Sequence, residues 1–362
     1  MIKNTLLIAI INIASILFIE YALSFFIFQK NIRNFSDTKR ITVPYRKNET
    51  AWLNSNEFSV KYYINNLGVR DKEGSTNRFG NYDMLLLGDS FSEGWGVKYE
   101  DSYFKIIESK SQKKHFNFSQ NGSSPVLYYH RLKFLLKQNK FKKVLIQIFD
   151  NDIHDNYRLR NINPNNNYEI EEISFIGKVK NYIKSKFRLY YLIKRIIHKA
   201  KGKPMPSFQF SNKANTLEIY EQEKIIDKFN IANNLSELNK WKQTDFSWYI
   251  NFDEAKWRES FKLHRKYLEK IITLCKQKNI DLEILYIPYH GVFYLDEVGK
   301  NKITNHHQTM LKEMSKEFGF KLIDLYDQFI NDPSSRSYFF ALDGHLNKIG
   351  HKKVANIYLE QR

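Results

Sequence analysis

The chain has 362 residues, 42% hydrophobic and 15% aromatic, which excludes a disordered protein and predicts a packed core. It carries 57 Lys and Arg against 39 Asp and Glu, a formal net charge of +18, so its expected partners are anionic: nucleic acid, lipid or acidic glycan. The sequence lacks zinc-finger spacing, an RNP-type aromatic motif and an obvious helix-turn-helix, so we expect no nucleic acid as a partner. The single cysteine, Cys275, excludes an internal disulfide and is expected in the core.

An apolar run at residues 6–28 predicts one transmembrane anchor within residues 1–28, since about 20 such residues span a bilayer. Glu20 lies toward the far end of the run, where burying a carboxylate in lipid costs less. No small-residue cleavage site follows, which favours an uncleaved anchor over a signal peptide; the alternative is a buried helix of a soluble domain. The basic flank after the run favours a cytoplasmic domain, but the whole chain is basic, so this signal has little weight.

Residues 29–80 are predicted to be a connector with short strands. Residues 58–64 alternate in part as a strand does, and residues 65–68 supply a turn. We expect an accessory strand pair or a sheet edge here.

From residue 81 onward, strand and helix patterns alternate. The alternation predicts an α/β fold, a three-layer sandwich with a five-stranded parallel sheet, across residues 81–362. Strands are expected at residues 84–87, 116–118, 144–149, 282–287 and 321–324, and helices at 101–113, 125–138, 257–277, 302–318 and 345–359.

An insertion is expected at about residues 157–253, where the alternation stops. Within it, residues 177–203 carry ten basic residues and no acidic one, and apolar residues recur at spacings of three and four. This pattern predicts a basic amphipathic helix. It either docks on the domain with a solvated basic face or rests on anionic lipid beside the anchor.

Ser90 follows the strand at 84–87 in the stretch Gly88-Asp89-Ser90, at a turn where parallel sheets bind ligands. It either caps the next helix or acts as a nucleophile. A hydrolytic serine also needs a base, an acid that orients the base, and donors for the oxyanion. Candidates follow the second strand, follow the third strand and lie near the C-terminus; they are Gly122, Asn151, Asp343 and His345.

These blocks resemble the SGNH (GDSL-type) hydrolase superfamily, especially its membrane-anchored cell-envelope members, which implies a flavodoxin-like fold for the five-stranded sheet. The resemblance covers about residues 60–160 and 255–362. The segment at residues 66–71 also looks like one common in the anchored members. The matching blocks are Gly88-Asp89-Ser90, Gly122, Asn151-Asp152 and Asp343-Gly344-His345.

The resemblance implies that Ser90 is the nucleophile, His345 its general base and Asp343 the carboxylate that orients His345. The oxyanion would be held by the backbone N–H groups of Ser90 and Gly122 and by the side-chain amide of Asn151. No cofactor and no metal are implied.

The sequence departs from the family pattern in two places. Phe149 stands where the third block usually begins with glycine, which would narrow the acyl pocket. Asp343 and His345 are two residues apart, whereas the last block is often Asp-x-x-His. Asp324 or Asp327, after the fifth strand, could orient His345 instead.

Other polar residues have simpler interpretations. Adjacent spacing makes loop hydrogen bonding a better expectation than a metal cluster for the acidic residues and histidine after the third strand. His306 and His307 flank a helix and are expected to be exposed, and His351 is expected at the surface or in packing. The loop residues in question are Asp150, Asp152, His154 and Asp155.

The apolar run predicts a single-pass membrane protein, and the resemblance to envelope members implies a catalytic domain on the extracytoplasmic side. The resemblance and the anchor together imply a serine-dependent acyl-ester hydrolase or O-acyltransferase that acts on a small acyl group, such as acetyl, of an envelope or exported polysaccharide. Two alternatives are a lipid esterase at the membrane surface and a catalytically silent glycan-binding or assembly subunit. The expected partners are the acylated glycan or lipid, and the membrane through the anchor and the basic helix at 177–203.

Overall fold

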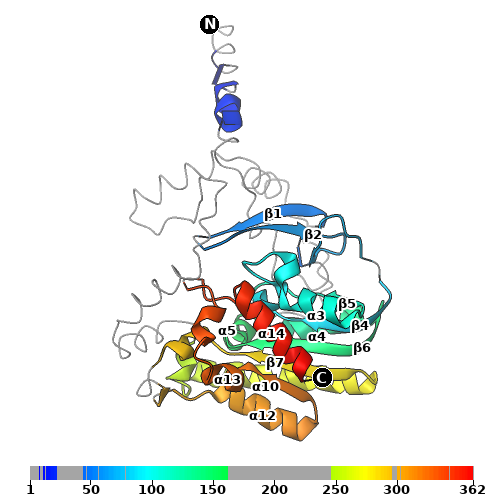
Figure 1. Cartoon of the computed structure of the whole chain (residues 1–362), viewed down its shortest axis with the longest axis vertical. Helices are drawn as coiled ribbons and strands as arrows, with labels where there is room; N and C mark the ends of the chain where they lie inside the picture. The colour runs from blue at the N-terminus through cyan, green and yellow to red at the C-terminus, as the bar shows by residue number, and fades with distance from the viewer. Residues whose placement is uncertain are drawn as a thin grey trace.

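The computed structural model describes residues 44–161, 246–295 and 300–361, apart from Arg46, Asn56, Arg78, Lys302 and Leu342, and also residues 8, 11, 12 and 14–22. Its centre is a five-stranded sheet in the order β5-β4-β6-β7-β8, and every neighbouring pair is parallel (Figure 1). This order is that of flavodoxin-like sheets and confirms the predicted α/β fold. The strands are β4 (Asn81–Leu87), β5 (His115–Asn117), β6 (Lys140–Phe149), β7 (Asp281–Ile287) and β8 (Lys321–Asp324).

The apolar run of β4 is explained by burial on both of its faces. Successive strand residues point to opposite faces of the sheet, and Met84 and Leu86 enter one core while Leu85 and Leu87 enter the other. All four are at most 1% exposed. A strand covered on both sides is continuously apolar, which is why its position could be read from the sequence.

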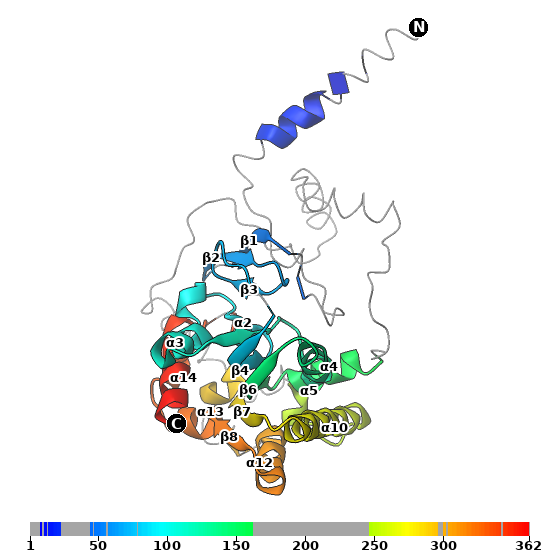
Figure 2. The ribbon, with the colours of Figure 1, turned by 90° about the vertical axis from the view of Figure 1, so that its right-hand side faces the viewer.

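Helices cover both faces of the sheet, which completes the three layers (Figure 2). One core contains apolar residues of α3 (Tyr103–Ser111), α13 (Leu325–Ile330) and α14 (Lys348–Glu360). The opposite core contains residues of α4, α10 and α12, and α5 packs on α4 and α10. These helices are α4 (Pro125–Leu135), α5 (Asp152–Leu159), α10 (Ala255–Gln277) and α12 (His306–Phe318). Short elements are α2 (Ser90–Glu93), η2 (Tyr99–Asp101), η3 (Ser247–Tyr249), η4 (His290–Tyr294) and η5 (Ser335–Tyr338).

A second sheet of three antiparallel strands precedes the parallel sheet in the chain. It contains β1 (Glu49–Asn54), β2 (Ser59–Ile64) and β3 (Arg70–Asp71). The strand expected at 58–64 is β2, whereas β1 was not predicted. Buried residues of this sheet pack against Trp95 and Phe340, so it covers part of the parallel-sheet domain.

The last helix begins later than predicted. Asn347 caps α14 by accepting hydrogen bonds from the backbone N–H groups of Ile349 and Gly350, so the helix starts at Lys348. His345 is therefore left in the preceding loop, where its side chain is not constrained by a helix.

The membrane-related predictions concern residues that are largely not described. Most of the expected anchor at residues 6–28 and all of the expected basic helix at 177–203 lie outside the described residues. Among the residues that are described, no helix combines the length and the apolar character needed to cross a membrane.

Candidate active site

Ser90 is presented by a tight turn directly after β4. Asp89, and not Ser90, is the N-cap of α2, because its carboxylate accepts a hydrogen bond from the N–H of Phe91 at 2.9 Å. Gly88 allows the backbone of this turn to pass close to the side chain of Gln147, because a Cβ at residue 88 would lie only 2.6 Å from the side-chain oxygen of Gln147. The serine hydroxyl is therefore not used as a cap.

Ser90, His345 and Asp343 form a hydrogen-bonded line. His345 Nε2 lies 2.7 Å from Ser90 Oγ, and His345 Nδ1 lies 2.5 Å from Asp343 Oδ1. A carboxylate only accepts hydrogen bonds, so Nδ1 of a neutral His345 carries the proton and Nε2 is free to accept the serine proton. The structure thus brings together three residues that the sequence placed at different ends of the chain.

Asp343, rather than either alternative carboxylate, faces His345. Asp324 caps α13 and accepts a hydrogen bond from Gln308, and Asp327 also contacts Gln308. Burial raises the pKa of Asp343, but the hydrogen bond and charge of His345 outweigh burial and hold that pKa below its ordinary value. Asp343 is therefore a stable anion beside the imidazole.

Gly344 explains why a two-residue spacing suffices. Its φ of +81° is a left-handed conformation that favours glycine, and a Cβ there would lie 2.8 Å from His290 Nδ1. This turn lets Asp343 and His345 point toward each other although only one residue separates them. The N–H of Asp343 donates to Glu57 at 2.8 Å. Glu57 lies between β1 and β2, so this bond fixes the turn to the three-stranded antiparallel sheet, called the accessory sheet below.

Gly122 and Asn151 follow the two strands that flank β4. Ligands bind outside the carboxyl ends of such strands, where the strand order reverses, and here that point lies between β4 and β6. Gly122 has a φ of +72°, and its carbonyl accepts a hydrogen bond from Arg158 at 2.7 Å. Asn151 stands before α5, and its side chain makes no cap hydrogen bond to that helix. Both predicted oxyanion residues thus lie at the same edge as Ser90.

The accessory sheet holds the loop after Ser90, a contact that the sequence did not predict. Arg70 donates to the carbonyls of Glu93 at 3.0 Å, Val97 at 2.6 Å and Gly94, and its guanidinium lies 3.7 Å from the centre of the Tyr62 ring. The segment at residues 66–71 was the only feature of the sequence that pointed to this contact. Every residue has a backbone carbonyl, so the sequence does not identify the acceptors of Arg70.

Glu93 links α2, which begins at Ser90, to the loop that contains Gly122. Its buried carboxylate accepts hydrogen bonds from Tyr45 Oη at 2.5 Å and from the N–H of Asn121 at 2.6 Å. Burial raises the pKa of Glu93 despite these donors. Residue 45 and the segment before Gly122 are thus joined through one carboxyl group.

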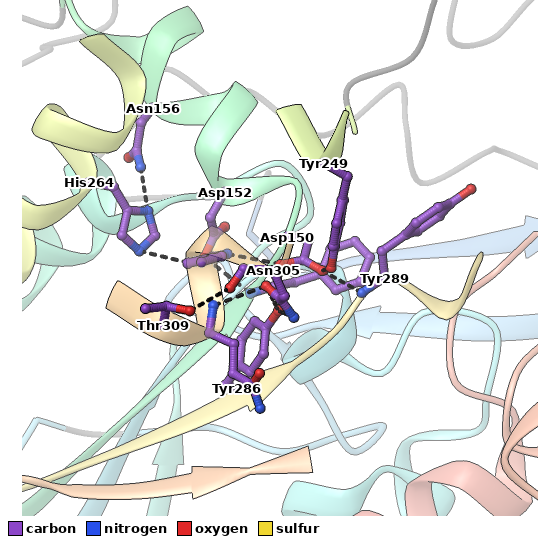
Figure 3. Close-up of polar contacts among 12 residues, drawn as sticks. Asp150, Asp152, Asn156, Tyr249, His264, Tyr286, Tyr289, Asn305 and Thr309 are labelled. Atoms are coloured by element: carbon purple, nitrogen blue, oxygen red, sulfur yellow. Dashed lines mark hydrogen bonds and ion pairs between the residues drawn. The ribbon is translucent and has the colours of Figure 1, made fainter. Parts of the chain in front are cut away.

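Asp150 is the centre of a buried polar network directly before Asn151 (Figure 3). Its fully buried carboxylate accepts hydrogen bonds from the hydroxyls of Tyr249 at 2.5 Å and Tyr286 at 2.8 Å, and from the N–H of Tyr289 at 2.6 Å. A fourth contact, at 2.9 Å, comes from His307 Nδ1. Asp150 therefore ties the turn after β6 to three separate parts of the chain.

The network continues through a pair of histidines. His307 Nε2 lies 3.2 Å from His264 Nε2, and His264 Nδ1 lies 2.7 Å from the amide nitrogen of Asn156. Because the Asn156 amide and His307 Nδ1 both donate, the pair is satisfied only when both rings are neutral and His264 Nε2–H donates to His307. Burial, and then the neighbouring His307, lower the pKa of His264, which agrees with this assignment.

His307 corrects the expectation that it is exposed. Its side chain is fully buried, whereas His306 beside it is half-buried against Phe252. The helix begins at His306, four residues later than predicted. Neighbouring residues on a helix point in different directions, and only His307 reaches Asp150.

The acidic residues after β6 make hydrogen bonds within the chain, as expected, but Asp152 and Asp155 lie in α5 and not in a loop. Asp152 accepts hydrogen bonds from the N–H of Phe149 at 3.3 Å and from Tyr128 at 3.2 Å, and Asp155 pairs with Arg158 at 3.0 Å. Within residues 44–161, 246–295 and 300–361, no three acidic, histidine or cysteine side chains gather in a way that could hold a metal ion.

His351 gives a pH-dependent prediction. Burial, with the charges of Arg70 and His345, lowers its pKa to about 3, against about 6.5 in the unfolded chain. Its contribution to stability is therefore complete above pH 6.5 and is lost as the pH falls toward 3, about 2 kcal/mol of it by pH 5. In urea denaturation at pH 7.5 and pH 5, His351→Asn should lose about 2 kcal/mol less between the two pH values than the wild type. An equal loss in both proteins would contradict the assignment.

Comparison with known proteins finds a match only among solved structures. No protein-family model matches the sequence, and no curated protein matches it. A protein assigned to the lipolytic G-D-S-L family from Desulfitobacterium hafniense is 11% identical, with a TM-score of 0.39 over 77% of this chain and 99% of that one. A member of the same family from Veillonella parvula is 12% identical, with a TM-score of 0.37 over 78% and 97%.

The acetyl xylan esterase AlAXEase is a third such structure. It is 14% identical, with a TM-score of 0.37 over 77% of this chain and 98% of that one. Likenesses this distant do not support a functional argument, so function has to be inferred from the residues of this chain. Of these three solved structures, two are named as lipolytic proteins of the G-D-S-L family and one as an acetyl xylan esterase.

Proposed function

We propose that this protein is a serine-dependent acyl-ester hydrolase. The observation that carries the proposal is the line from Ser90 Oγ through His345 to Asp343, built from residues 255 positions apart. A hydroxyl, an imidazole and a carboxylate in this order are the groups that nucleophilic acyl transfer requires.

The reaction follows from the positions of these groups. Ser90 Oγ attacks the ester carbonyl while its proton passes to His345 Nε2, and Asp343 stabilises the imidazolium that forms. The backbone N–H groups of Ser90 and Gly122 and the amide of Asn151 would bind the oxyanion. His345 then donates its proton to the leaving alcohol, and a water molecule, activated by the same imidazole, hydrolyses the acyl-enzyme.

The finer assignment is a small acyl group on an envelope or exported polysaccharide. If a sugar hydroxyl replaces water in the second step, the same site is an O-acyltransferase. Two features support an envelope location: the net charge of +18 suits acidic glycan or anionic lipid, and apolar side chains near the N-terminus, including Leu17 and Phe18, are 56% and 70% exposed. The proposed arrangement is a single-pass anchor with the catalytic domain on the extracytoplasmic side.

The test is turnover of p-nitrophenyl acetate by the full chain in detergent, compared with Ser90→Ala. The wild type should hydrolyse the ester and, in a separate reaction, should be phosphonylated on Ser90 by a fluorophosphonate probe with loss of fluoride, whereas Ser90→Ala should show neither the adduct nor turnover above background. Equal rates for the two proteins would instead favour the silent glycan-binding subunit. Acetyl release from an O-acetylated polysaccharide, against release of fatty acid from phospholipid vesicles, then separates the glycan substrate from the lipid substrate.

A further inference from the structure

A row of aromatic rings begins at the His345 imidazole. The Phe91 ring, on the residue after Ser90, lies 4.9 Å from the imidazole centre, and the Phe149 ring lies 4.2 Å from Phe91. The Trp95 ring also contacts the imidazole, with the ring centres 5.6 Å apart. Phe149 is therefore one ring removed from the imidazole that contacts Ser90.

The row continues beyond Phe149 along the carboxyl edge of the sheet. Phe246 packs edge-on against Phe149 at 6.0 Å, and Tyr289 stacks on Phe246 at 3.8 Å with an interplanar angle of 11°. The backbone N–H of Tyr289 is held by Asp150, the residue after Phe149. Phe149 therefore has an aromatic neighbour on each side, Phe91 and Phe246.

Phe149 lies at the end of β6 and packs against Phe91, the residue that follows Ser90. It is the last residue of β6, and Phe149 and Phe91 are only 6% and 2% exposed. In the first tetrahedral intermediate on Ser90, the oxyanion faces its proposed donors and the leaving alkoxide lies near His345, which protonates it. The acyl chain then extends along the remaining side, where close-packed rings leave little space without costly rearrangement.

We propose that Phe149 limits the acyl group to about two or three carbons, so that the enzyme acts on acetyl esters and excludes fatty acyl chains. The inference rests on the proposed function and specifies its substrate class. Phe149 acts here as a specificity-determining residue, since it contacts the acyl chain and takes no part in the proton transfers. The same limit favours a glycan acetyl ester over a membrane lipid.

The experiment compares p-nitrophenyl acetate, butyrate and hexanoate with the full chain in detergent. Phe149→Ala should raise the ratio of kcat/KM for butyrate to that for acetate by about 10-fold or more, in the range that one or two methylenes contribute in an apolar pocket. Phe149→Leu should give a smaller rise and keeps the test valid if the alanine variant fails to fold. Phe141→Ala is the matched control, because Phe141 lies in the same strand, is also 6% exposed and belongs to the opposite core.

The outcomes separate this inference from the proposed function. A raised ratio in both Phe149 variants, with the wild-type ratio retained in Phe141→Ala, supports it. Wild-type turnover of hexanoate as fast as acetate, or an unchanged ratio in both Phe149 variants, overturns it while leaving the esterase assignment intact. Turnover that does not depend on Ser90 overturns the proposed function, and this inference with it.

Discussion

Replacing His345 with alanine should lower kcat/KM for p-nitrophenyl acetate by at least about 10⁴-fold. The imidazole at 2.7 Å is the group in the described structure placed to accept the Ser90 proton, so the variant loses both the base and the acid of the reaction. Asp343→Asn should lose a comparable factor, because an amide that accepts from Nδ1–H no longer stabilises the imidazolium, and one that donates selects the wrong tautomer. Initial rates at saturating and limiting substrate would measure both effects.

The control for this prediction is Asp327→Asn. Asp327 was a sequence-based alternative for orienting His345, yet its side chain is 54% exposed and pairs with Lys312 at 2.7 Å. Its replacement should leave kcat/KM within about two-fold of the wild type, since an exposed ion pair contributes at most about 1 kcal/mol to stability. Substantial activity in Asp343→Asn together with a large loss in Asp327→Asn would reverse the assignment of the carboxylate.

Replacing Asp150 with alanine should lower the free energy of unfolding by about 3–5 kcal/mol. Two tyrosine hydroxyls, one backbone N–H and the His307 ring would lose their common acceptor in a place that water does not reach. Each buried donor left unpaired costs about 1–3 kcal/mol. Urea denaturation at pH 7.5, followed by circular dichroism, would measure the change.

Asp253→Ala is the matched control for Asp150, because its carboxylate side chain is 98% exposed. It should change the free energy of unfolding by no more than about 0.5 kcal/mol. A loss below about 1 kcal/mol in Asp150→Ala would contradict the network. Asp150→Asn keeps the shape of the side chain and should fall between the wild type and alanine.

The parallel sheet could be predicted because its signal is local. Four consecutive buried residues in β4 follow from cover on both faces, and polar residues after the strands mark the edge where ligands bind. Ser90 could be predicted as a site residue for the same reason, since it follows the end of such a strand. The position of His345 needed the resemblance as well, because a loop histidine has no periodicity of its own.

The supporting contacts could not be predicted in this way. Arg70 binds backbone carbonyls, and any residue supplies a carbonyl, so the sequence does not identify its partners. His264 and His307 lie on two different helices and are 43 positions apart in the chain. A helical pattern predicts which face is buried, but it does not predict which residue that face contacts. The sequence predicted only loop hydrogen bonding for Asp150. Its four hydrogen-bond donors come from distant segments of the chain, so the residues next to Asp150 do not reveal them.

The hydrogen bonds from Arg70 to the loop after Ser90 have a consequence for the length of chain that the proposed enzyme needs. Together with the Glu57 contact to Asp343 and the Tyr45 contact to Glu93, they mean that residues 45–71 supply side chains to the backs of both halves of the triad. The smallest unit able to keep the nucleophile and its base in register therefore starts upstream of β1. A shortened protein that begins at β4 would retain the parallel sheet. It would lose the contacts of Tyr45, Glu57 and Arg70 that hold the segments carrying Ser90 and Asp343.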